Sequence, residues 1–231
     1  MRLDEEYCLS EYVDLGRLGD NEKVHIVRNQ VNGVIGVRKY VALDLEEIYL
    51  FLKENPNAYI PKIYECIQTD TNLIVIEEYL SGKNLEEMLK EKYFSEKDAA
   101  DIIICLCNAL YPLHHAKMPV ICRDLKAENV ILTNEGEVKL VDFDIARIYQ
   151  PGKSKDTVMM GTQGYAAPEQ FGFGQTDART DIYAMGVLLN YMLVREFPME
   201  KLTEGKFIVL MINKESQLLH FCNHASASFL F

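Results

Sequence analysis

Basic residues are scarce in this sequence. It has 24 lysines and arginines against 35 aspartates and glutamates, a formal net charge of -11. Proteins that grip nucleic acid or an anionic membrane without regard to sequence need clustered Lys and Arg. The charge therefore argues against both kinds of partner, and any binding of phosphate must depend on a local arrangement of a few groups.

Long apolar runs and paired cysteines are also missing. No apolar run approaches the roughly 18 residues of a membrane-spanning helix. The acidic N-terminal stretch, residues 1–16, lacks the charged-then-apolar order of a signal peptide. The six cysteines include no C-x-x-C pair, which favours reduced thiols. We therefore expect a cytoplasmic protein.

Short β-branched runs mark the first 80 residues, at 24–27, 33–37 and 72–76. Turn residues such as Asn32-Gly33 separate them, a pattern typical of antiparallel strands. In residues 43–55 apolar side chains recur at three-to-four spacing until Asn55-Pro56, which predicts one helix. The first part of the chain is thus expected to be a small sheet with one helix.

From residue 81 onward the pattern becomes helical. Periodic stretches cover 84–93, 95–116 and 180–193, and Ser95 is a suitable N-cap with Asp98 three residues on. Together the two parts predict an α+β fold with domains 1–80 and 81–231. Residues 118–175 show little periodicity, and a long irregular segment inside a compact domain usually carries function.

Three motifs in or beside that irregular stretch point to phosphoryl transfer: CRDLKAEN at 122–129, LVDFDIAR at 140–147 and GTQGYAAPEQ at 161–170. This reaction asks little covalent work of a protein. It needs an acceptor for the hydroxyl proton, ligands for Mg²⁺ and positive groups beside the phosphate oxygens. The Asp, Lys and Asn of the first motif and the first Asp of the second are side chains of those kinds.

C-R-D-L-x-x-x-N and V-D-F-D resemble the catalytic loop and the metal-binding motif of eukaryotic-type Ser/Thr protein kinases, in the style of the bacterial members. The resemblance implies a bilobal fold, ATP as phosphoryl donor, Mg²⁺ (with Mn²⁺ as the alternative) and a protein Ser or Thr hydroxyl as acceptor. It implies that Asp124 is the base and that Lys126 steadies the γ-phosphoryl. Asn129 and Asp142 would bind the metal.

The third motif separates protein kinases from a rival family. Ala167-Pro168-Glu169 resembles the A-P-E segment, Thr162 falls where the substrate-facing threonine would lie, and residues 181–186 resemble the helix whose Asp braces the catalytic loop. Small-molecule kinases related to aminoglycoside kinases share the Asp-x-x-x-x-Asn loop and lack A-P-E. The motif therefore favours a protein substrate.

The stretch NLIVIEEYLSG at 72–82 resembles the passage between kinase lobes, so backbone groups near Glu78 and Leu80 are expected to meet adenine. Glu77 then occupies the gatekeeper position, where apolar residues are usual. A carboxylate that faces a nucleotide pocket needs a partner or water. The alternative is that Glu77 turns outward and carries no specificity.

The strand cation is ambiguous. Matching Gly36-Val37-Arg38 to the A-I-K of the family puts Arg38 beside the phosphates, with Lys39 as the alternative, because alternate residues of a strand share a face. The expected helix partner is Glu47, or Glu46 by one step. Arg and Lys are not interchangeable at such a site.

The chain departs from the family in four places. Its glycine loop is degenerate, with Gly16 and Gly19 before Val24. Asp20 and Glu22 in that turn would repel phosphate unless they face solvent, which suggests modest ATP affinity. Cys122 and Asp144 replace the usual His and Gly of the two motifs. The tail from about residue 199 is atypical.

Two further hypotheses follow from the resemblance. Ser154 and Thr157 would accept phosphate in a self-modification neutralised by Arg123. A pseudokinase that serves as a nucleotide-binding or purely scaffolding module is the alternative function, because the glycine loop, the strand cation and the tail all depart from the family.

Overall fold

The structure is a computed structural model that describes residues 3–19, 22–152, 160–172 and 174–197. Ser154, Thr157 and the tail from about residue 199 lie outside these ranges. The chain divides into two compact units between Ser81 and Gly82, where the sequence predicts a boundary between residues 80 and 81.

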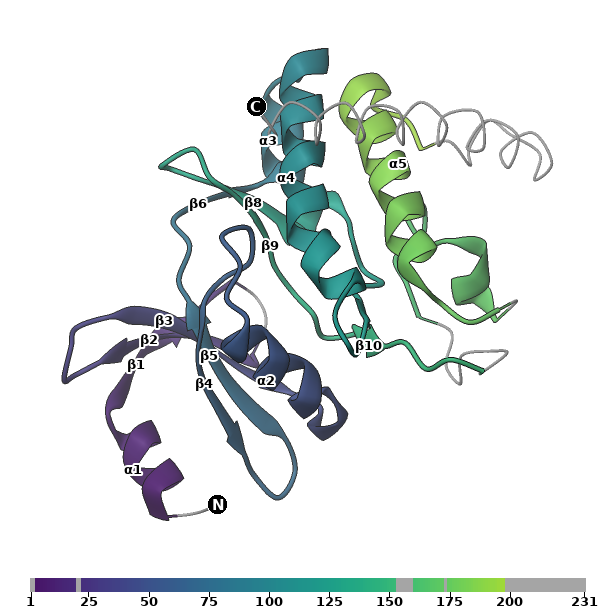
Figure 1. Ribbon diagram of the computed structural model, residues 1–231. Coiled ribbons are helices and arrows are strands. Elements are labelled where there is room, and N and C mark those ends of the chain that lie inside the picture. The colour runs from purple at the N-terminus through teal and green to yellow at the C-terminus, as the bar shows by residue number, and fades with distance from the viewer. Residues whose placement is uncertain (1–2, 20–21, 153–159, 173, 198–231) are drawn as a thin grey trace, which may run out of the picture. The chain divides into compact units, whose positions relative to one another are not determined.

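The smaller unit contains a five-stranded antiparallel sheet in the order β1-β2-β3-β5-β4 (Figure 1). Its strands are β1 (Tyr12–Arg17), β2 (Val24–Asn29), β3 (Ile35–Val41), β4 (Ile63–Gln68) and β5 (Leu73–Glu78). The predicted turn at Asn32-Gly33 joins β2 to β3, and Gly33 takes the positive φ of 75° that this turn requires. The predicted antiparallel sheet is confirmed.

Three helical segments accompany this sheet: α1 (Leu3–Ser10), the 3₁₀ turn η1 (Leu43–Leu45) and α2 (Glu46–Glu54). Helix α2 packs along β4 and buries Ile48, Tyr49 and Leu52. It ends just before Pro56, whose fixed φ and missing N–H do not suit a helix. The helix predicted over 43–55 is therefore present as η1 plus α2.

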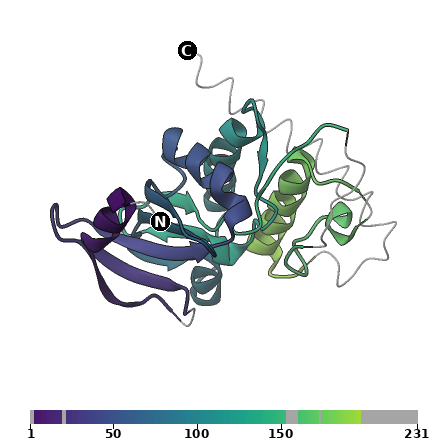
Figure 2. The same ribbon diagram turned by 90° about the horizontal axis from the view of Figure 1, so that it is seen from below.

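The larger unit is built on α3 (Leu85–Glu91), α4 (Glu96–His114) and α5 (Ala178–Val194). Helices α4 and α5 lie side by side (Figures 1 and 2). Each of the three begins at a capping box, on Asn84, Ser95 and Asp177 respectively. The Ser95 cap agrees with the prediction, because its Oγ accepts the Asp98 N–H at 3.1 Å.

Short strands connect these helices. One sheet joins β6 (Gly82–Asn84), β8 (Val130–Thr133) and β9 (Val138–Leu140), and a second pairs β7 (Val120–Ile121) with β10 (Arg147–Ile148). The chain also makes 3₁₀ turns at η2 (Ala127–Asn129) and η3 (Pro168–Phe171). The α+β class is confirmed.

No helix in the described ranges combines the length and the apolar character that crossing a membrane requires.

Candidate active site

Four of the predicted residues meet around one carboxylate in the larger unit. Asp124 lies in the loop between β7 and η2, and its Oδ1 accepts the Thr162 hydroxyl at 2.6 Å. Its Oδ2 accepts Lys126 Nζ at 2.7 Å and Asn129 Nδ2 at 3.1 Å. Lys126 Nζ also donates to Thr162 Oγ1 at 3.1 Å. The cluster joins residues up to 38 positions apart in the chain.

The Asp124 carboxylate is oriented and still accessible. Its side chain is 14% exposed and that of Lys126 is 21% exposed. Donors on both oxygens hold the carboxylate in one direction, as a general base needs before it can meet a hydroxyl. An ammonium placed next to that base suits a reaction in which negative charge is transferred.

A fully buried carboxylate holds the backbone of this loop. Asp181, in the first turn of α5, accepts the N–H groups of Cys122 at 2.9 Å and Arg123 at 2.8 Å, and His114 Nε2 lies 2.7 Å from its Oδ2. Arg123 has a φ of 70°, a conformation costly for a non-glycine residue unless its surroundings enforce it. The bracing predicted for this helix is present.

Gln170 fastens the same loop from another side. Its Nε2 donates to the carbonyls of Arg123 at 2.8 Å and Met160 at 2.7 Å, and its Oε1 accepts the Ala167 N–H at 3.0 Å. The side chain is buried, with 3% exposed. It therefore ties the catalytic loop to the segment that carries Thr162.

The two predicted metal ligands lie next to the paired strands β8 and β9, because Asn129 directly precedes β8 and Asp142 lies two residues after β9. Asn129 is buried, and its Nδ2 donates to the Asp124 carbonyl at 2.9 Å, so its Oδ1 is the acceptor. The Val141 N–H donates to the Asn129 carbonyl at 2.9 Å. The backbone of Asp142, the next residue, therefore lies close to that of Asn129. Carboxylate and amide oxygens are ligands that Mg²⁺ accepts.

These two residues fit a metal that is shared with a substrate. In the described part of the chain no three His, Cys, Asp or Glu side chains cluster closely enough to hold an ion. Mg²⁺ commonly binds through one or two carboxylates and completes its shell with phosphate oxygens and water. The residue set is therefore suited to a metal that arrives with a nucleotide.

In the smaller unit the neighbouring cations Arg38 and Lys39 have different partners. Lys39 Nζ lies 2.6 Å from Glu77 Oε1, whereas Arg38 Nη2 lies 2.6 Å from Asp14 Oδ2. His25 also contacts that Asp14 oxygen, at 2.8 Å. Consecutive strand residues point to opposite faces, so the two cations serve different surfaces.

Glu77 does not turn outward, and whether it carries specificity stays a prediction. Its side chain is 9% exposed and is paired with Lys39 on the face that also carries Val24. This pairing favours Lys39 over Arg38 as the strand cation, although contact with phosphate remains a prediction. Gly36, whose added Cβ would lie 2.9 Å from the Glu77 carbonyl, lets β3 approach β5 at this point.

The expected helix partner Glu47 is exposed, whereas Glu46 is half-buried. Burial raises the pKa of the Cys66 thiol on β4 to about 11, and the charges of Glu46 and Glu77 add to that shift. Which of these two acids of α2, Glu46 or Glu47, meets Lys39 stays a prediction.

The remaining predicted nucleotide contacts lie in and after β1 and at or just after the end of β5. Gly16 in β1 and Gly19 in the β1–β2 connection take positive φ values of 131° and 68°, and the Leu18 N–H donates to the Val24 carbonyl at 2.9 Å. Glu78 Oε2 accepts the Lys62 N–H at 3.1 Å, and Leu80 is half-buried. Their contacts with a nucleotide stay predictions.

A family model of the protein kinase domain matches residues 28–228 of this chain. The chain belongs to the protein kinase family. The match includes the segment from about residue 199 that the sequence alone marks as atypical.

Curated kinases from distant organisms resemble the chain. It is 38% identical over 130 residues to the probable serine/threonine-protein kinase PknB of Corynebacterium glutamicum, covering 54% of this chain and 20% of the relative. It is 38% identical over 133 residues to a probable serine/threonine-protein kinase of Clostridium perfringens, covering 57% and 19%. It is 30% identical over 204 residues to protein kinase C zeta type of Oryctolagus cuniculus, covering 83% and 34%. The chain thus spans a fifth to a third of the length of these relatives.

Three contacts of this kinase domain were not predicted from the sequence. They are His114 on Asp181, Gln170 on the catalytic loop, and the Thr180 hydroxyl on Glu169 Oε1 at 2.6 Å. The position of Gln170 directly after A-P-E was the only available signal, and it carries no information about partners so far away in the chain.

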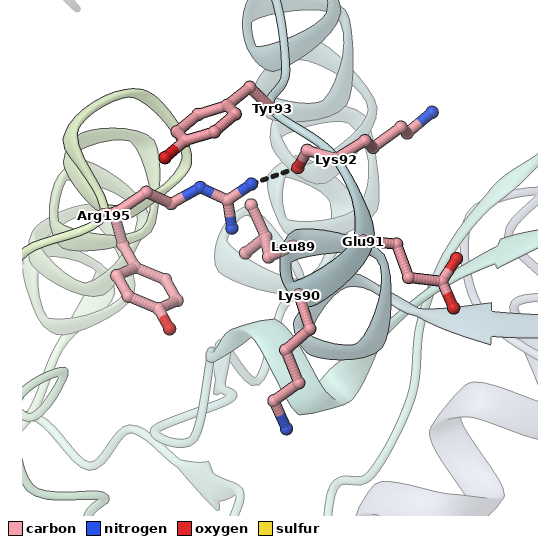
Figure 3. Close-up of a pocket in the computed structure, with 7 residues that line it drawn as sticks. Leu89, Lys90, Glu91, Lys92, Tyr93 and Arg195 are labelled. Carbon is pink, nitrogen blue, oxygen red and sulfur yellow. Dashed lines mark hydrogen bonds between the residues drawn. The ribbon is translucent and has the colours of Figure 1, made fainter.

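A separate pocket of about 300 Å³ lies in the larger unit between the end of α3 and the end of α5 (Figure 3). The Arg195 guanidinium donates to the Lys92 carbonyl and stacks over Tyr93 there. None of the predicted catalytic or metal-binding residues lines this pocket.

The buried Cys122 of the kinase loop is expected to be inert. Burial first, and the nearby Asp181 charge second, raise the pKa of its thiol well above the ordinary value, and the thiolate is the reactive form. We predict that iodoacetamide at pH 8 modifies Cys122 at least about a hundredfold more slowly than the half-buried Cys8. Peptide mass spectrometry over time measures both rates. Equal rates in the folded protein would contradict the prediction, and unfolding in guanidinium should equalise them.

Proposed function

We propose that the chain is an ATP-dependent Ser/Thr protein kinase domain that transfers the γ-phosphoryl group to a protein hydroxyl. The observation that carries this proposal is the cluster of Asp124, Lys126, Asn129 and Thr162 around one accessible carboxylate. The names of the curated relatives support the same activity.

Each residue of the cluster has a definite task in this proposal. The substrate oxygen attacks the γ-phosphorus, the bond to the β,γ-bridging oxygen breaks, and ADP leaves with that electron pair. Asp124 accepts the hydroxyl proton. Lys126, already within hydrogen-bond distance of Asp124, stabilises the charge on the transferred group.

Thr162 would occupy the hydrogen-bonding position that the hydroxyl of the substrate Ser or Thr takes over. Its hydroxyl donates to Asp124 and accepts from Lys126, so it fixes the positions of both side chains. An incoming Ser or Thr hydroxyl can replace one of these contacts, because it offers the same donor and acceptor chemistry.

Asn129 Oδ1 and the Asp142 carboxylate would hold Mg²⁺, or Mn²⁺ in its place. When bound, the ion neutralises phosphate charge. The chain's own contribution is the hydrogen bond from the Val141 N–H to the Asn129 carbonyl, which holds the backbone segments that carry the two ligands beside each other.

The proposed partners are cytoplasmic proteins with an accessible Ser or Thr, and the chain itself through Ser154 or Thr157. Bacterial kinases are among the matches, together with a mammalian one. Mass spectrometry after incubation with MgATP tests self-modification, and no phosphate on either residue would count against it.

The test of function is transfer of ³²P from γ-labelled ATP to myelin basic protein, compared between the wild type and Asp142→Asn. We expect the variant to lose at least about a hundredfold in rate, because it removes a charged metal ligand. Calorimetry with MgATP runs alongside. Uptake of nucleotide without transfer by the wild type would overturn the proposal and leave the pseudokinase alternative.

A further inference from the structure

The most unusual feature of the smaller unit is the ion pair between Lys39 on β3 and Glu77 on β5. The register pairs Lys39 with Val75 and Val37 with Glu77. Lys39 and Glu77 are therefore diagonal neighbours on one face of the sheet, a distance that long side chains can span. Their charged atoms are 2.6 Å apart.

The surroundings of this pair are dry. The side chains of Lys39 and Glu77 are 13% and 9% exposed, and the neighbouring Val37 and Val75 are 5% and 0% exposed. Separating a buried pair is strongly unfavourable. An anion that approaches Lys39 therefore meets the Glu77 carboxylate already paired with it.

A nucleotide would bring such an anion. If Lys39 is the phosphate-contacting cation, as the proposed function implies, one ammonium must serve both the Glu77 carboxylate and a phosphate group. Two anions that share one cation repel each other, and at a few ångströms in a protein this repulsion is large.

We propose that Glu77 competes with the nucleotide phosphate for Lys39 and so weakens nucleotide binding. This inference rests on the proposed function. It assigns Lys39 a permanent partner on β5, the Glu77 carboxylate, in addition to any acidic residue on α2.

The test measures MgATP affinity by isothermal titration calorimetry on the full chain. Glu77→Gln keeps the shape and an acceptor for Lys39 and removes the charge. We expect its Kd to be about tenfold lower than that of the wild type, a change of about 1.4 kcal/mol. Adding Lys39→Met to Glu77→Gln should abolish the gain, because the gain acts through the ammonium.

The matched control is Glu65→Gln. Glu65 forms a 3.0 Å ion pair with Lys53 in the same unit, so the variant removes one carboxylate charge from a cross-element pair without touching Lys39. Its Kd should stay within about twofold of the wild-type value, because this pair is half-exposed and screened.

Several outcomes overturn the inference. An unchanged or higher Kd in Glu77→Gln would show that Glu77 does not compete, and the proposed kinase function would survive if the wild type still transferred phosphate. If neither the wild type nor Glu77→Gln bound nucleotide, both the inference and the proposed kinase function would be overturned. Binding by Glu77→Gln alone would support the inference.

A second variant covers the case in which Glu77→Gln does not fold, as judged by circular dichroism. Glu77→Asp keeps the charge and withdraws the carboxylate by one methylene. It should bind MgATP about threefold more tightly, because the contact with Lys39 is longer. Weaker binding by a folded Glu77→Asp would overturn the inference.

Discussion

Replacing Asp124 by Asn is expected to lower kcat for phosphoryl transfer by about a thousandfold and to leave KM for ATP within about threefold. The amide has the same shape and can be accommodated, because the Thr162 hydroxyl can turn from donor to acceptor while Oδ1 faces Lys126. What the variant loses is a group that takes up the substrate proton. Steady-state kinetics with labelled ATP measure both parameters.

Glu128→Gln is the control for this prediction. Glu128 is exposed in η2, one residue before Asn129. The variant therefore removes one negative charge from the same loop, as Asp124→Asn does. Its kcat should remain within about twofold of the wild type, because exposed charges are screened. A loss of less than tenfold in Asp124→Asn would show that Asp124 is not the proton acceptor, whatever the family resemblance implies.

The catalytic loop could be predicted from sequence because its information is local. Asp124, Lys126 and Asn129 lie within six residues, and the hydrogen bonds of Asp124 to Lys126 and Asn129 depend on this short stretch of backbone. The N-cap at Ser95 and the turn at Asn32-Gly33 are equally local. Short-range interactions of this kind can be predicted without knowledge of the tertiary structure.

The strand cation could not be predicted in this way. A shift of one residue along a strand exchanges its two faces, so Arg38 and Lys39 have the same local sequence and opposite surroundings. Which one meets Glu77 depends on the register between β3 and β5, strands separated by more than 30 residues. The contacts of His114 and Gln170 are just as distant, at 67 and 47 positions from their partners.

The largest loss of stability is expected from Asp181→Ala. The variant removes the acceptor of two buried backbone N–H groups, on Cys122 and Arg123, and of His114 Nε2. Each buried donor left without a partner costs about 1–3 kcal/mol, so we expect the free energy of unfolding to fall by about 3–5 kcal/mol. Urea denaturation followed by circular dichroism measures the change.

Asp177→Ala provides the matched control, because Asp177 lies four positions earlier, at the N-cap of α5. Its carboxylate accepts the Arg179 N–H at 2.9 Å, and loss of such a cap costs about 1 kcal/mol. If both variants lost the same stability, Asp181 would act as an ordinary helix-start residue. A larger loss in Asp181→Ala, with impaired transfer in the fraction that folds, would follow from release of Arg123 from its positive φ, since Asp124 is the next residue in the chain.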